Sequence, residues 1–422
     1  MDKFIIEGPT PLKGTIPISG SKNAAMPLMA ASLLASSPTK LNLIPRLNDI
    51  YTFKKVIEET GTSVVFDGGS NSMVLNPANL HNTEAPYELV RRMRASFYML
   101  GALIGNAGEA KVSLPGGCAW GPRPVDLHLK GFEAMGVKIK LGQGYVFASI
   151  DNASVEGGEF TLNPSSVGAT INLVLGAVKR AKKFVIKNAA KEPDVVLLCR
   201  MLVEMGADIE GIGTDTLTIQ KVDELKGVEY SNDPDRIEAG TFMIAAAMHP
   251  ESDVTLTGCR PEQLGKFPES FNKLGVECTI DGSVIRIKST DNLQPVSVTT
   301  KIYPGFPTDL QAQWATLMTQ AGGTSMVTDT VYFDRFSYVP ELNRLGGNLK
   351  VEKNRVTIVG KTQLSGASVM STDLRASVSL VMAAMVAKGT SEILRVYHLD
   401  RGYEQLEEKL NRVGASIKRV PQ

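Results

Sequence analysis

One cysteine of this sequence lies in a segment rich in glycine and proline. The stretch PGGCAWGPRPVDLH, residues 115–128, contains Cys118, followed by Arg123 and Asp126. The two glycines before the cysteine favour a mobile segment, as expected of a lid that closes over a ligand. Arginines lower the pKa of a thiol and a bound phosphate raises it. From the residues alone, a nucleophile and a general acid are equally good interpretations of Cys118.

The remaining cysteines and the histidines show no spacing typical of metal binding. Cys199 and Cys259 are expected to be small buried hydrophobic residues, the usual role of a free cysteine. The four cysteines form neither a CxxC nor a zinc-ligand pattern, which predicts reduced thiols. A lone histidine such as His128 is more typical of a structural residue than of a catalytic one. Phosphate-loop, dinucleotide and zincin motifs are also missing, so we expect neither a metal nor a cofactor.

Basic residues stand at the start of three predicted helices, at Lys22, Arg94 and Arg375. A cation there opposes the helix dipole at a cost of some tenths of a kcal/mol, unless an anion lies between the two. Free N–H groups together with a cation form a site for phosphate or carboxylate. Solvated surface charge is the alternative for any single one of these residues. Ser166 and Asp309, at two other helix starts, fit ordinary helix caps.

The helices in question belong to a sequence repeat. A phrase that ends in glycine recurs about every 70 residues, too long for the usual solenoid repeats of roughly 20 to 50 residues. An amphipathic helix precedes each glycine, and a strand, a tight turn and a second strand follow. In the fourth copy the predicted turn is Asp281 with Gly282. The glycines are Gly61, Gly136, Gly206, Gly275, Gly346 and Gly414.

Each repeat begins with a different helix, which is alanine-rich and apolar on nearly all sides. Such a helix has no face for water and belongs inside a domain. We therefore predict an α/β fold of two inside-out α/β barrel domains, each made of three repeated units around buried helices. The buried helices are expected at residues 23–35, 95–107, 169–181, 239–250, 309–323 and 374–389.

The domain boundary is expected between the third and fourth repeats. Residues 229–240 are polar and contain Pro234, which is typical of a hinge. The opening strand has no helix before it, so we expect it to pair with the second domain. The first domain is then 22–232, and the second is 1–21 plus 233–422.

Composition and charge exclude several classes of partner. Lys and Arg total 45 against 44 Asp and Glu, so no overall field favours nucleic acid or an anionic membrane. No window reaches the ~18 apolar residues of a membrane span, and the N-terminus lacks a signal-peptide pattern. We expect a cytoplasmic protein that binds neither nucleic acid nor membrane.

Taken together, the motifs resemble the UDP-N-acetylglucosamine 1-carboxyvinyltransferase family of enolpyruvyl transferases. The resemblance runs from end to end and is carried by ISGSKNAA, MRAS, LPGGC with RPVDLH, SVGAT, PDRIE, YPGFPTDLQAQ, VPELNRLG, DLRAS and YHLDRGYE. It implies a monomeric enzyme with its active site in the cleft between two inside-out domains. The implied reaction moves the enolpyruvyl group of phosphoenolpyruvate to the 3′-hydroxyl of UDP-N-acetylglucosamine and releases phosphate, as the first committed step of peptidoglycan synthesis.

The resemblance also implies roles for individual residues. Cys118 would protonate the methylene carbon of phosphoenolpyruvate and be alkylated by fosfomycin, and Asp309 would contact the 3′-hydroxyl as a candidate base. The expected phosphate ligands are Lys22, Arg94, Arg123 and Arg401. Arg335 and Arg375 would grip the planar carboxylate. The expected contacts to the nucleotide sugar are Asn23, Arg123, Pro124, Val125, Asp126, Leu127, Ser166, Val167, Gly168 and Val331.

Some positions depart from the family pattern. Trp120 stands where we expect an aliphatic residue, and Pro164 where many members place a basic residue near the diphosphate. Phe333 and Asp334 stand where Glu and Asn precede the arginine. These differences concern lid motion and nucleotide affinity.

Two other functions are alternatives to enolpyruvyl transfer onto UDP-N-acetylglucosamine. The sister enzyme 5-enolpyruvylshikimate-3-phosphate synthase shares the fold and the donor, but the motif GCAWGPRPVDLH argues against it. A catalytically silent sensor of nucleotide sugars is the other. The intact residues Lys22, Cys118, Asp309 and Arg401 argue against that function.

Overall fold

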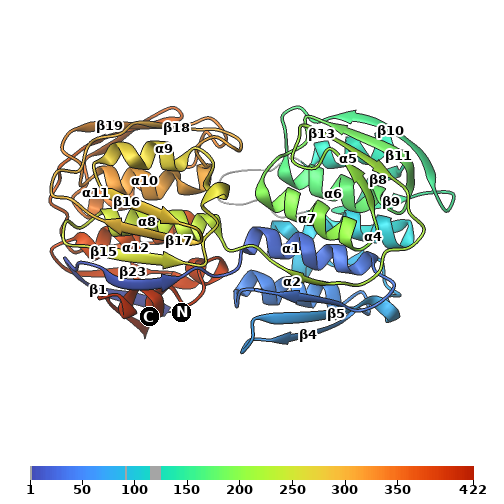
Figure 1. The fold of residues 1–422 in the computed structure, drawn as a ribbon, viewed down its shortest axis with the longest axis horizontal. Coiled ribbons are helices and arrows are strands. Elements are labelled where there is room, and N and C mark those ends of the chain that lie inside the picture. Colours follow the sequence, from blue (N-terminus) through green and yellow to red (C-terminus); the bar gives the residue numbers. More distant parts are fainter. Residues whose placement is uncertain (1, 91–92, 115–124) are drawn as a thin grey trace. The chain divides into compact units, whose positions relative to one another are not determined.

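A computed structural model of the chain describes residues 2–90, 93–114 and 125–422, except for the side chain of Arg94 (Figure 1). The chain divides into a first unit, Gly20–Asp233, and a second unit, Met1–Ser19 with Pro234–Gln422. The sequence placed the first domain at 22–232. Among the described residues, no helix has the length and apolar character needed to cross a bilayer.

The first unit carries three four-stranded sheets among its described residues. Their strand orders are β14-β3-β5-β4, β6-β7-β9-β8 and β10-β11-β13-β12. The strands are β3 (Thr39–Asn42), β4 (Ser63–Asp67), β5 (Ser72–Asn76), β6 (Glu84–Ala85), β7 (Glu109–Ser113), β8 (Lys138–Gly142), β9 (Tyr145–Ser149), β10 (Val155–Thr161), β11 (Ala181–Lys187), β12 (Asp208–Glu210), β13 (Thr216–Gln220) and β14 (Glu229–Ser231).

The second unit repeats this plan. Its sheets have the orders β16-β17-β15-β2, β18-β19-β21-β20 and β22-β23-β1-β24. The strands are β1 (Asp2–Gly8), β2 (Lys13–Pro17), β15 (Asp253–Thr257), β16 (Glu277–Asp281), β17 (Val284–Lys288), β18 (Val298–Thr300), β19 (Thr324–Asp329), β20 (Leu349–Glu352), β21 (Arg355–Val359), β22 (Ser368–Met370), β23 (Gly389–Leu394) and β24 (Ser416–Pro421). In all six sheets one edge pair is parallel and the other two pairs are antiparallel.

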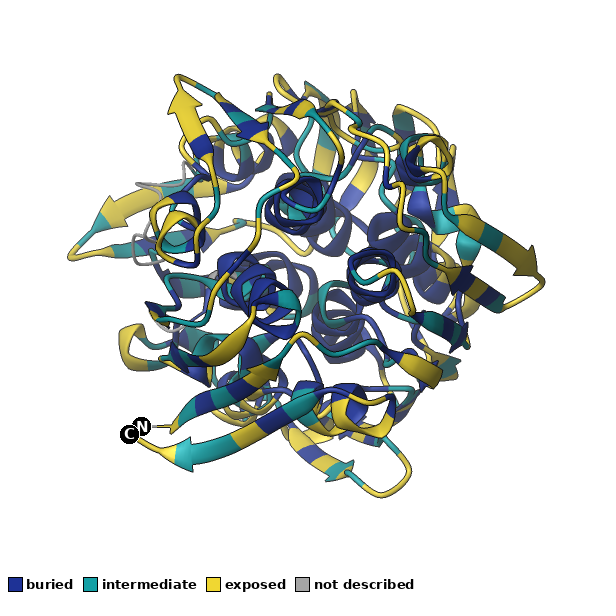
Figure 2. Cartoon of the chain, turned by 90° about the vertical axis from the view of Figure 1, so that its left-hand side faces the viewer, coloured by how far each residue is buried: buried dark blue, intermediate teal, exposed yellow. Residues whose placement is uncertain are grey.

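Buried helices fill the interior of each unit, which confirms the inside-out fold. In Figure 2 these helices are dark blue, and the outer elements carry the yellow, exposed residues. The buried helices are α1 (Lys22–Ala31), α4 (Tyr98–Ala107) and α6 (Val167–Ala177) in the first unit, and α8 (Arg236–Ala247), α10 (Gln311–Met318) and α12 (Leu374–Val386) in the second. The others are α2 (Asn48–Glu58), α3 (Tyr87–Val90), α5 (Asp126–Met135), α7 (Pro193–Glu204), α9 (Phe267–Phe271), α11 (Val339–Arg344) and α13 (Leu406–Arg412).

The buried helices of the first unit run parallel. A Cβ atom on Gly101 would lie 2.3 Å from the carbonyl oxygen of Asn172, and one on Gly105 would lie 2.3 Å from that of Leu175. Later residues of α4 therefore face later residues of α6, so the two helices run in the same direction. They approach so closely that only glycine fits at the two contact positions of α4. At the far end, the Asn106 amide donates to the carbonyl of Leu33, just after α1. The leading ends of all three helices therefore lie at one end of the unit.

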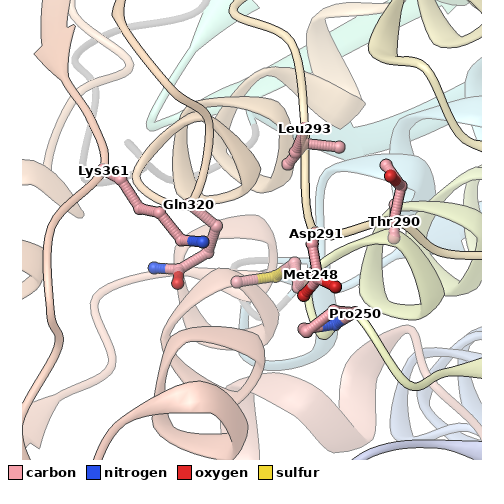
Figure 3. A pocket seen from close by; sticks show the side chains of 8 residues that line it. Met248, Pro250, Thr290, Asp291, Leu293, Gln320 and Lys361 are labelled. Carbon is pink, nitrogen blue, oxygen red and sulfur yellow. The ribbon is translucent and has the colours of Figure 1, made fainter.

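The second unit has the same arrangement. Gln313, near the start of α10, donates to the Thr241 hydroxyl in the first half of α8 at 3.2 Å, and Arg375 at the start of α12 reaches Asp309 just before α10. At the opposite end, a small hollow lies beside the last turns of α8 and α10 (Figure 3). It is lined by Ala247, Met248, Pro250, Thr290, Asp291, Leu293, Gln320 and Lys361.

The structure confirms the six glycines as helix ends and corrects other details. All six have φ between 84° and 112°, the left-handed region in which glycine ends a helix without strain. The predicted turn at Asp281 and Gly282 lies one residue further on, because Asp281 pairs with Val284 and the loop is Gly282 with Ser283. The outer helix of the fourth repeat is broken at Gly265 (φ 59°) into η4 (Pro261–Leu264), α9 and η5 (Asn272–Leu274).

The sixth repeat differs from the expected hairpin. Its second hairpin strand is β1, from the other end of the chain, which pairs with β24 from Asp2 opposite Pro421 to Glu7 opposite Ser416. The chain therefore begins and ends within what would be one hairpin. In four sheets the parallel edge strand, β6, β10, β18 or β22, comes shortly before the buried helix of its own repeat. In the other two sheets the edge strand is β14, which follows the other strands of the first unit, or β2, which precedes the first unit. The sequence did not predict these edge strands.

Candidate active site

Three predicted site residues of the second unit are in direct contact. Asp309 lies in the short turn η6 (Thr308–Leu310), directly before α10. Its Oδ1 accepts a hydrogen bond from Arg335 Nη1 at 2.7 Å, and its Oδ2 accepts one from Arg375 Nη2 at 3.0 Å. The arginine side chains are 8% and 6% exposed, whereas that of Asp309 is 27% exposed.

The two guanidinium groups control the charge of Asp309. Burial alone would raise the pKa of this carboxyl, but Arg375 and Arg335 outweigh burial and hold its pKa well below the usual range. Burial would likewise lower the pKa of Arg375, but Asp309 raises it above its usual value. Asp309 is therefore an anion at neutral pH, and a weak base while both arginines hold it.

Three further residues hold Arg375 and Asp309 in place. The Tyr403 hydroxyl accepts from Arg375 Nη1 at 3.1 Å and lies 2.9 Å from the hydroxyl of Thr241. Gln313 Nε2 donates to the backbone carbonyl of Asp309 at 2.9 Å. The sequence analysis did not single out these three. The sequence could have indicated two of them by their spacing from predicted site residues. Gln313 lies one helical turn after Asp309, and Tyr403 lies two residues after Arg401.

Asp329 is a fourth residue that sequence reasoning missed. This carboxylate, at the end of β19, is fully buried. Its Oδ1 accepts from the Thr300 hydroxyl and from the backbone N–H groups of Val331 and Tyr332, at 2.7 to 2.9 Å. Its Oδ2 accepts from the hydroxyl of Thr308 at 2.7 Å. Asp329 thus fixes the backbone of the predicted sugar contact Val331 and the residue next to Asp309.

Arg401 precedes Tyr403, the hydrogen-bond partner of Arg375, by two residues. It is the last residue of η7 (Val396–Arg401), which packs against α12. Asp373 caps α12, since its Oδ1 accepts from the backbone N–H groups of Arg375 and Ala376. The start of α12 is therefore fixed at the point where Arg375 reaches Asp309.

In the first unit, Lys22 is the first residue of α1 and has a carboxylate partner. Its Nζ lies 2.6 Å from Oδ2 of Asp49 on α2, and the two side chains are 12% and 5% exposed. Ser21 caps the helix by accepting from the backbone N–H of Ala24. Asn23, the next residue, is half-buried. The sequence analysis did not identify Asp49, because the pairing joins two separate helices.

The start of α6 brings together another predicted group. Ser166 caps this helix by accepting from the N–H of Ala169 at 3.3 Å, and Val167 and Gly168 are its first two residues. A Cβ on Gly168 would lie 3.2 Å from the ring of His128. Only glycine therefore fits here without a shift of the histidine.

His128 is held by Asn172 in the middle of α6. The Asn172 Oδ1 accepts from the N–H of Gly101 at 2.8 Å and its Nδ2 donates to the carbonyl of Phe97 at 3.1 Å, which fixes the amide orientation. The same Nδ2 lies 2.8 Å from Nδ1 of His128, so this ring nitrogen accepts a hydrogen bond. The contact joins α5, α4 and α6, in agreement with a structural role for His128.

The other predicted residues are only partly described. Val125 precedes α5, and Asp126 and Leu127 begin it; Asp126 is exposed and lies 3.5 Å from Lys130. Cys118, Trp120, Arg123 and Pro124 lie outside the described residues. The backbone of Arg94 begins η3 (Arg94–Phe97), and its side chain is not described.

Two of the remaining cysteines match the sequence prediction, and Cys278 is partly buried. Cys199 and Cys259 are buried, and burial raises the pKa of each thiol to about 12. Among residues 2–90, 93–114 and 125–422, no group of three or more His, Cys, Asp or Glu side chains could hold a metal ion.

Comparison with known proteins identifies the family. Residues 6–410 match the model of EPSP synthase (3-phosphoshikimate 1-carboxyvinyltransferase). The chain is 49% identical over 420 residues to a UDP-N-acetylglucosamine 1-carboxyvinyltransferase of Chlorobaculum parvum, covering 99% of this chain and 98% of the relative. It is 48% identical to the enzyme of that name from Chloroherpeton thalassium, covering 99% and 97%.

Solved structures share the fold. The enolpyruvyl transferase NikO from Streptomyces tendae superposes with a TM-score of 0.91 at 24% identity, covering 100% of this chain and 99% of that one. An EPSP synthase from Acinetobacter baumannii gives a TM-score of 0.77 at 18% identity, with both chains fully covered. The chain therefore belongs to the EPSP synthase family of enolpyruvyl transferases, in the branch of the UDP-N-acetylglucosamine 1-carboxyvinyltransferases.

Proposed function

We propose that this enzyme transfers the enolpyruvyl group of phosphoenolpyruvate to the 3′-hydroxyl of UDP-N-acetylglucosamine, the first committed step of peptidoglycan synthesis. The observation that carries the proposal is the identity of almost half of all positions, over nearly the whole chain, to proteins named for this activity. The contact of Asp309 with Arg335 and Arg375 supports it, because Asp309 and Arg375 stand at the starts of α10 and α12, where an anion is also stabilised by free N–H groups.

We assign the donor to cations of both units. Arg335 and Arg375 grip the carboxylate of phosphoenolpyruvate, whose planar shape matches a guanidinium group. The phosphate binds Lys22, Arg123 and Arg401, with Arg94 in support. This assignment requires the leading ends of the buried helices of both units to border one cleft.

The acceptor binds mainly to the first unit. Arg123, Pro124, Val125, Asp126 and Leu127 hold the uridine. Ser166, Val167 and Gly168 hold the diphosphate through backbone N–H groups at the start of α6, as helix N-termini do. Asn23 and Val331 contact the sugar. Gly168 follows the capping residue by two positions, so its backbone N–H is among those at the helix start that no helix carbonyl pairs with.

The chemistry needs proton transfers in both of its steps and no electron transfer. The 3′-hydroxyl oxygen forms a bond to C2 of phosphoenolpyruvate while Asp309 takes the hydroxyl proton, and the Cys118 thiol gives a proton to C3. The tetrahedral intermediate then loses phosphate as the bond from C2 to the phosphate oxygen breaks and a proton passes from C3 to the Cys118 thiolate, which restores the double bond. Asp309 gives its proton to the leaving phosphate, so both groups return to their starting forms. The cations stabilise the charge that develops on the reacting group.

The sister reaction on a shikimate acceptor is the alternative, since the matching family model is named for it. The identities weigh against it: 49% to the relative from Chlorobaculum parvum, against 18% to the EPSP synthase structure. The motif RPVDL, assigned to the uridine, argues in the same direction.

The test is phosphate release from phosphoenolpyruvate by the purified protein. We expect release only when UDP-N-acetylglucosamine is present. Release with shikimate 3-phosphate instead transfers the assignment to the sister enzyme. Binding of both substrates without release favours a silent sensor.

We also propose that the enzyme is a cytoplasmic monomer. Each unit encloses its own hydrophobic core, so neither needs a second copy to cover it. Both substrates are phosphorylated metabolites whose charge keeps them inside the cell. Light scattering should give a mass near 45.4 kDa, and twice that mass contradicts the proposal.

A further inference from the structure

Asp309 occupies the two guanidinium groups that the proposed function assigns to the substrate carboxylate. Each of its oxygens takes one arginine, Oδ1 that of Arg335 and Oδ2 that of Arg375. A carboxylate is the same planar, two-oxygen anion whether it belongs to an aspartate or to an α-keto acid derivative. The side chain of Asp309 is therefore an internal copy of the group that these arginines would bind.

We propose that Asp309 and the carboxylate of the substrate are alternative partners of Arg335 and Arg375, so that donor binding releases Asp309. The inference rests on the proposed function, because it takes the assignment of the substrate carboxylate from there. It adds the order of events. Asp309 is held as a weak base until the carboxylate of the substrate takes its place on the two arginines.

The arginines are held by groups that do not depend on Asp309. The Tyr403 hydroxyl accepts from Nη1 of Arg375, and the Tyr403 ring lies 5.5 Å from that guanidinium carbon. The hydroxyl of Thr308 accepts from Nη1 of Arg335 at 3.2 Å, and that hydroxyl is itself fixed by Asp329. Both cations therefore keep their positions when Asp309 leaves, and present a preformed site to the incoming anion.

Asp309 can leave without a change in the fold. Its side chain is the most exposed of the three, and it lies in a single 3-10 turn. Gln313 holds its backbone carbonyl, so a rotation about χ1 moves the carboxylate while the backbone stays in place. The released carboxylate remains next to the arginines and available to an acceptor hydroxyl.

The exchange links proton transfer to the presence of the donor. With both arginines as partners, the carboxylate has little tendency to take a proton, because each guanidinium stabilises the ionised form. Once the substrate carboxylate neutralises the arginines, this stabilisation falls and Asp309 becomes a stronger base. The acceptor hydroxyl is then deprotonated only when the carbon that it attacks is in place.

The experiment measures the binding of phosphoenolpyruvate alone, by isothermal titration calorimetry, to the wild-type enzyme and to Asp309→Asn and Asp309→Ala. If Asp309 competes for the arginines, both variants bind phosphoenolpyruvate more tightly, by at least about fivefold, because a charge-assisted pair no longer opposes binding. Binding that is equal or weaker, or undetectable in all three proteins, overturns the proposal.

Two controls separate exchange from a general loss of negative charge. Asp235→Asn removes a charge that acts on Arg375 from the start of α8, while an asparagine keeps the helix cap. We expect less than a twofold gain there, and a gain equal to that of Asp309→Asn contradicts the exchange. Inorganic phosphate can bind a free guanidinium group but lacks the carboxylate, so it should gain less than phosphoenolpyruvate, and an equal gain for phosphate also contradicts the exchange.

The same preparations distinguish this inference from the proposed function. Wild-type enzyme that releases phosphate with UDP-N-acetylglucosamine, combined with no tighter binding by the Asp309 variants, refutes the exchange and leaves the function intact. Wild-type enzyme without phosphate release refutes the function itself.

Discussion

Lys22 and Asp49 form an almost buried ion pair, with Nζ and Oδ2 2.6 Å apart. Removing either partner from such a pair leaves a charge in a poorly hydrated site, which costs about 3 kcal/mol in typical cases. Lys22→Met and Asp49→Asn should therefore both lower the free energy of unfolding. Only Lys22→Met should also abolish turnover, because Lys22 is the proposed phosphate ligand.

A double variant completes this test. Lys22→Met with Asp49→Asn should recover part of the stability that each single change loses, since neither charge is then left alone. Urea unfolding of the four proteins measures the coupling. Additive losses would show that the pair contributes nothing to stability.

Fosfomycin should inactivate the enzyme through a single cysteine. Cys199 and Cys259 are buried thiols whose pKa is raised to about 12, so they carry almost no thiolate at neutral pH. We expect time-dependent loss of activity and one adduct, at Cys118, by peptide mass spectrometry. Cys118→Asp should resist the drug, and equal sensitivity of the two proteins would remove Cys118 from the site.

The features that local sequence encodes were predicted well. Gly275 and its five counterparts end helices because a left-handed residue is needed wherever a helix turns into a strand, and this need can be read from a few neighbouring residues. The buried helices were likewise visible in their composition. The sixth sheet was not, because β1 and β24 come from opposite ends of the chain.

The candidate site likewise contains residues that the sequence predicted and residues that it did not. Lys22, Asp309 and Arg375 stand in recognisable motifs at helix starts. Asp49 and Asp329 do not, because their roles arise only when separate elements pack together. A lone aspartate after a strand carries no signal of the four donors that surround it.

Acid should weaken the contribution of Asp309 to stability. Its pKa is lowered in the folded protein, so the stabilisation is complete above the unfolded pKa, about 3.9, and disappears as the pH falls toward the folded pKa. The difference in unfolding free energy between the wild type and Asp309→Asn should be constant between pH 5 and pH 7 and shrink below about pH 4. A difference that is the same at pH 3 and pH 6 would falsify the depressed pKa.

Asp329 should act as a positioning residue. Asp329→Asn keeps the size of the side chain but replaces one acceptor oxygen with an amide, so either Thr308 or the turn at Val331 loses its partner. We expect kcat to fall about tenfold and the KM for UDP-N-acetylglucosamine to rise, because a displacement near 1 Å at a reacting group has effects of this size or larger. The KM for phosphoenolpyruvate should change less.

A purely structural Asp329 would give a different result. The variant would then lose thermal stability, while kcat and both KM values of the folded protein stayed at wild-type levels. Thr300→Val is a milder comparison, since it removes one of the four donors to Asp329 and the acceptor of the Thr330 N–H, but leaves the hydrogen bonds of Asp329 with Thr308, Val331 and Tyr332 in place.

Gly101→Ala should be among the most destabilising small substitutions in the first unit. The new Cβ would lie 2.3 Å from the carbonyl oxygen of Asn172, and a backbone oxygen cannot move aside as a flexible side chain can. Pushing α4 away from α6 should cost about 3 kcal/mol or more, and it would also break the hydrogen bond from the Gly101 N–H to the Asn172 amide that orients His128. Gly142→Ala, where the nearest atom to the new Cβ is a Phe147 ring carbon at 3.7 Å, should change the unfolding free energy little. Urea unfolding compares the two, and similar midpoints would mean that the close approach of α4 and α6 does not limit the stability of this unit.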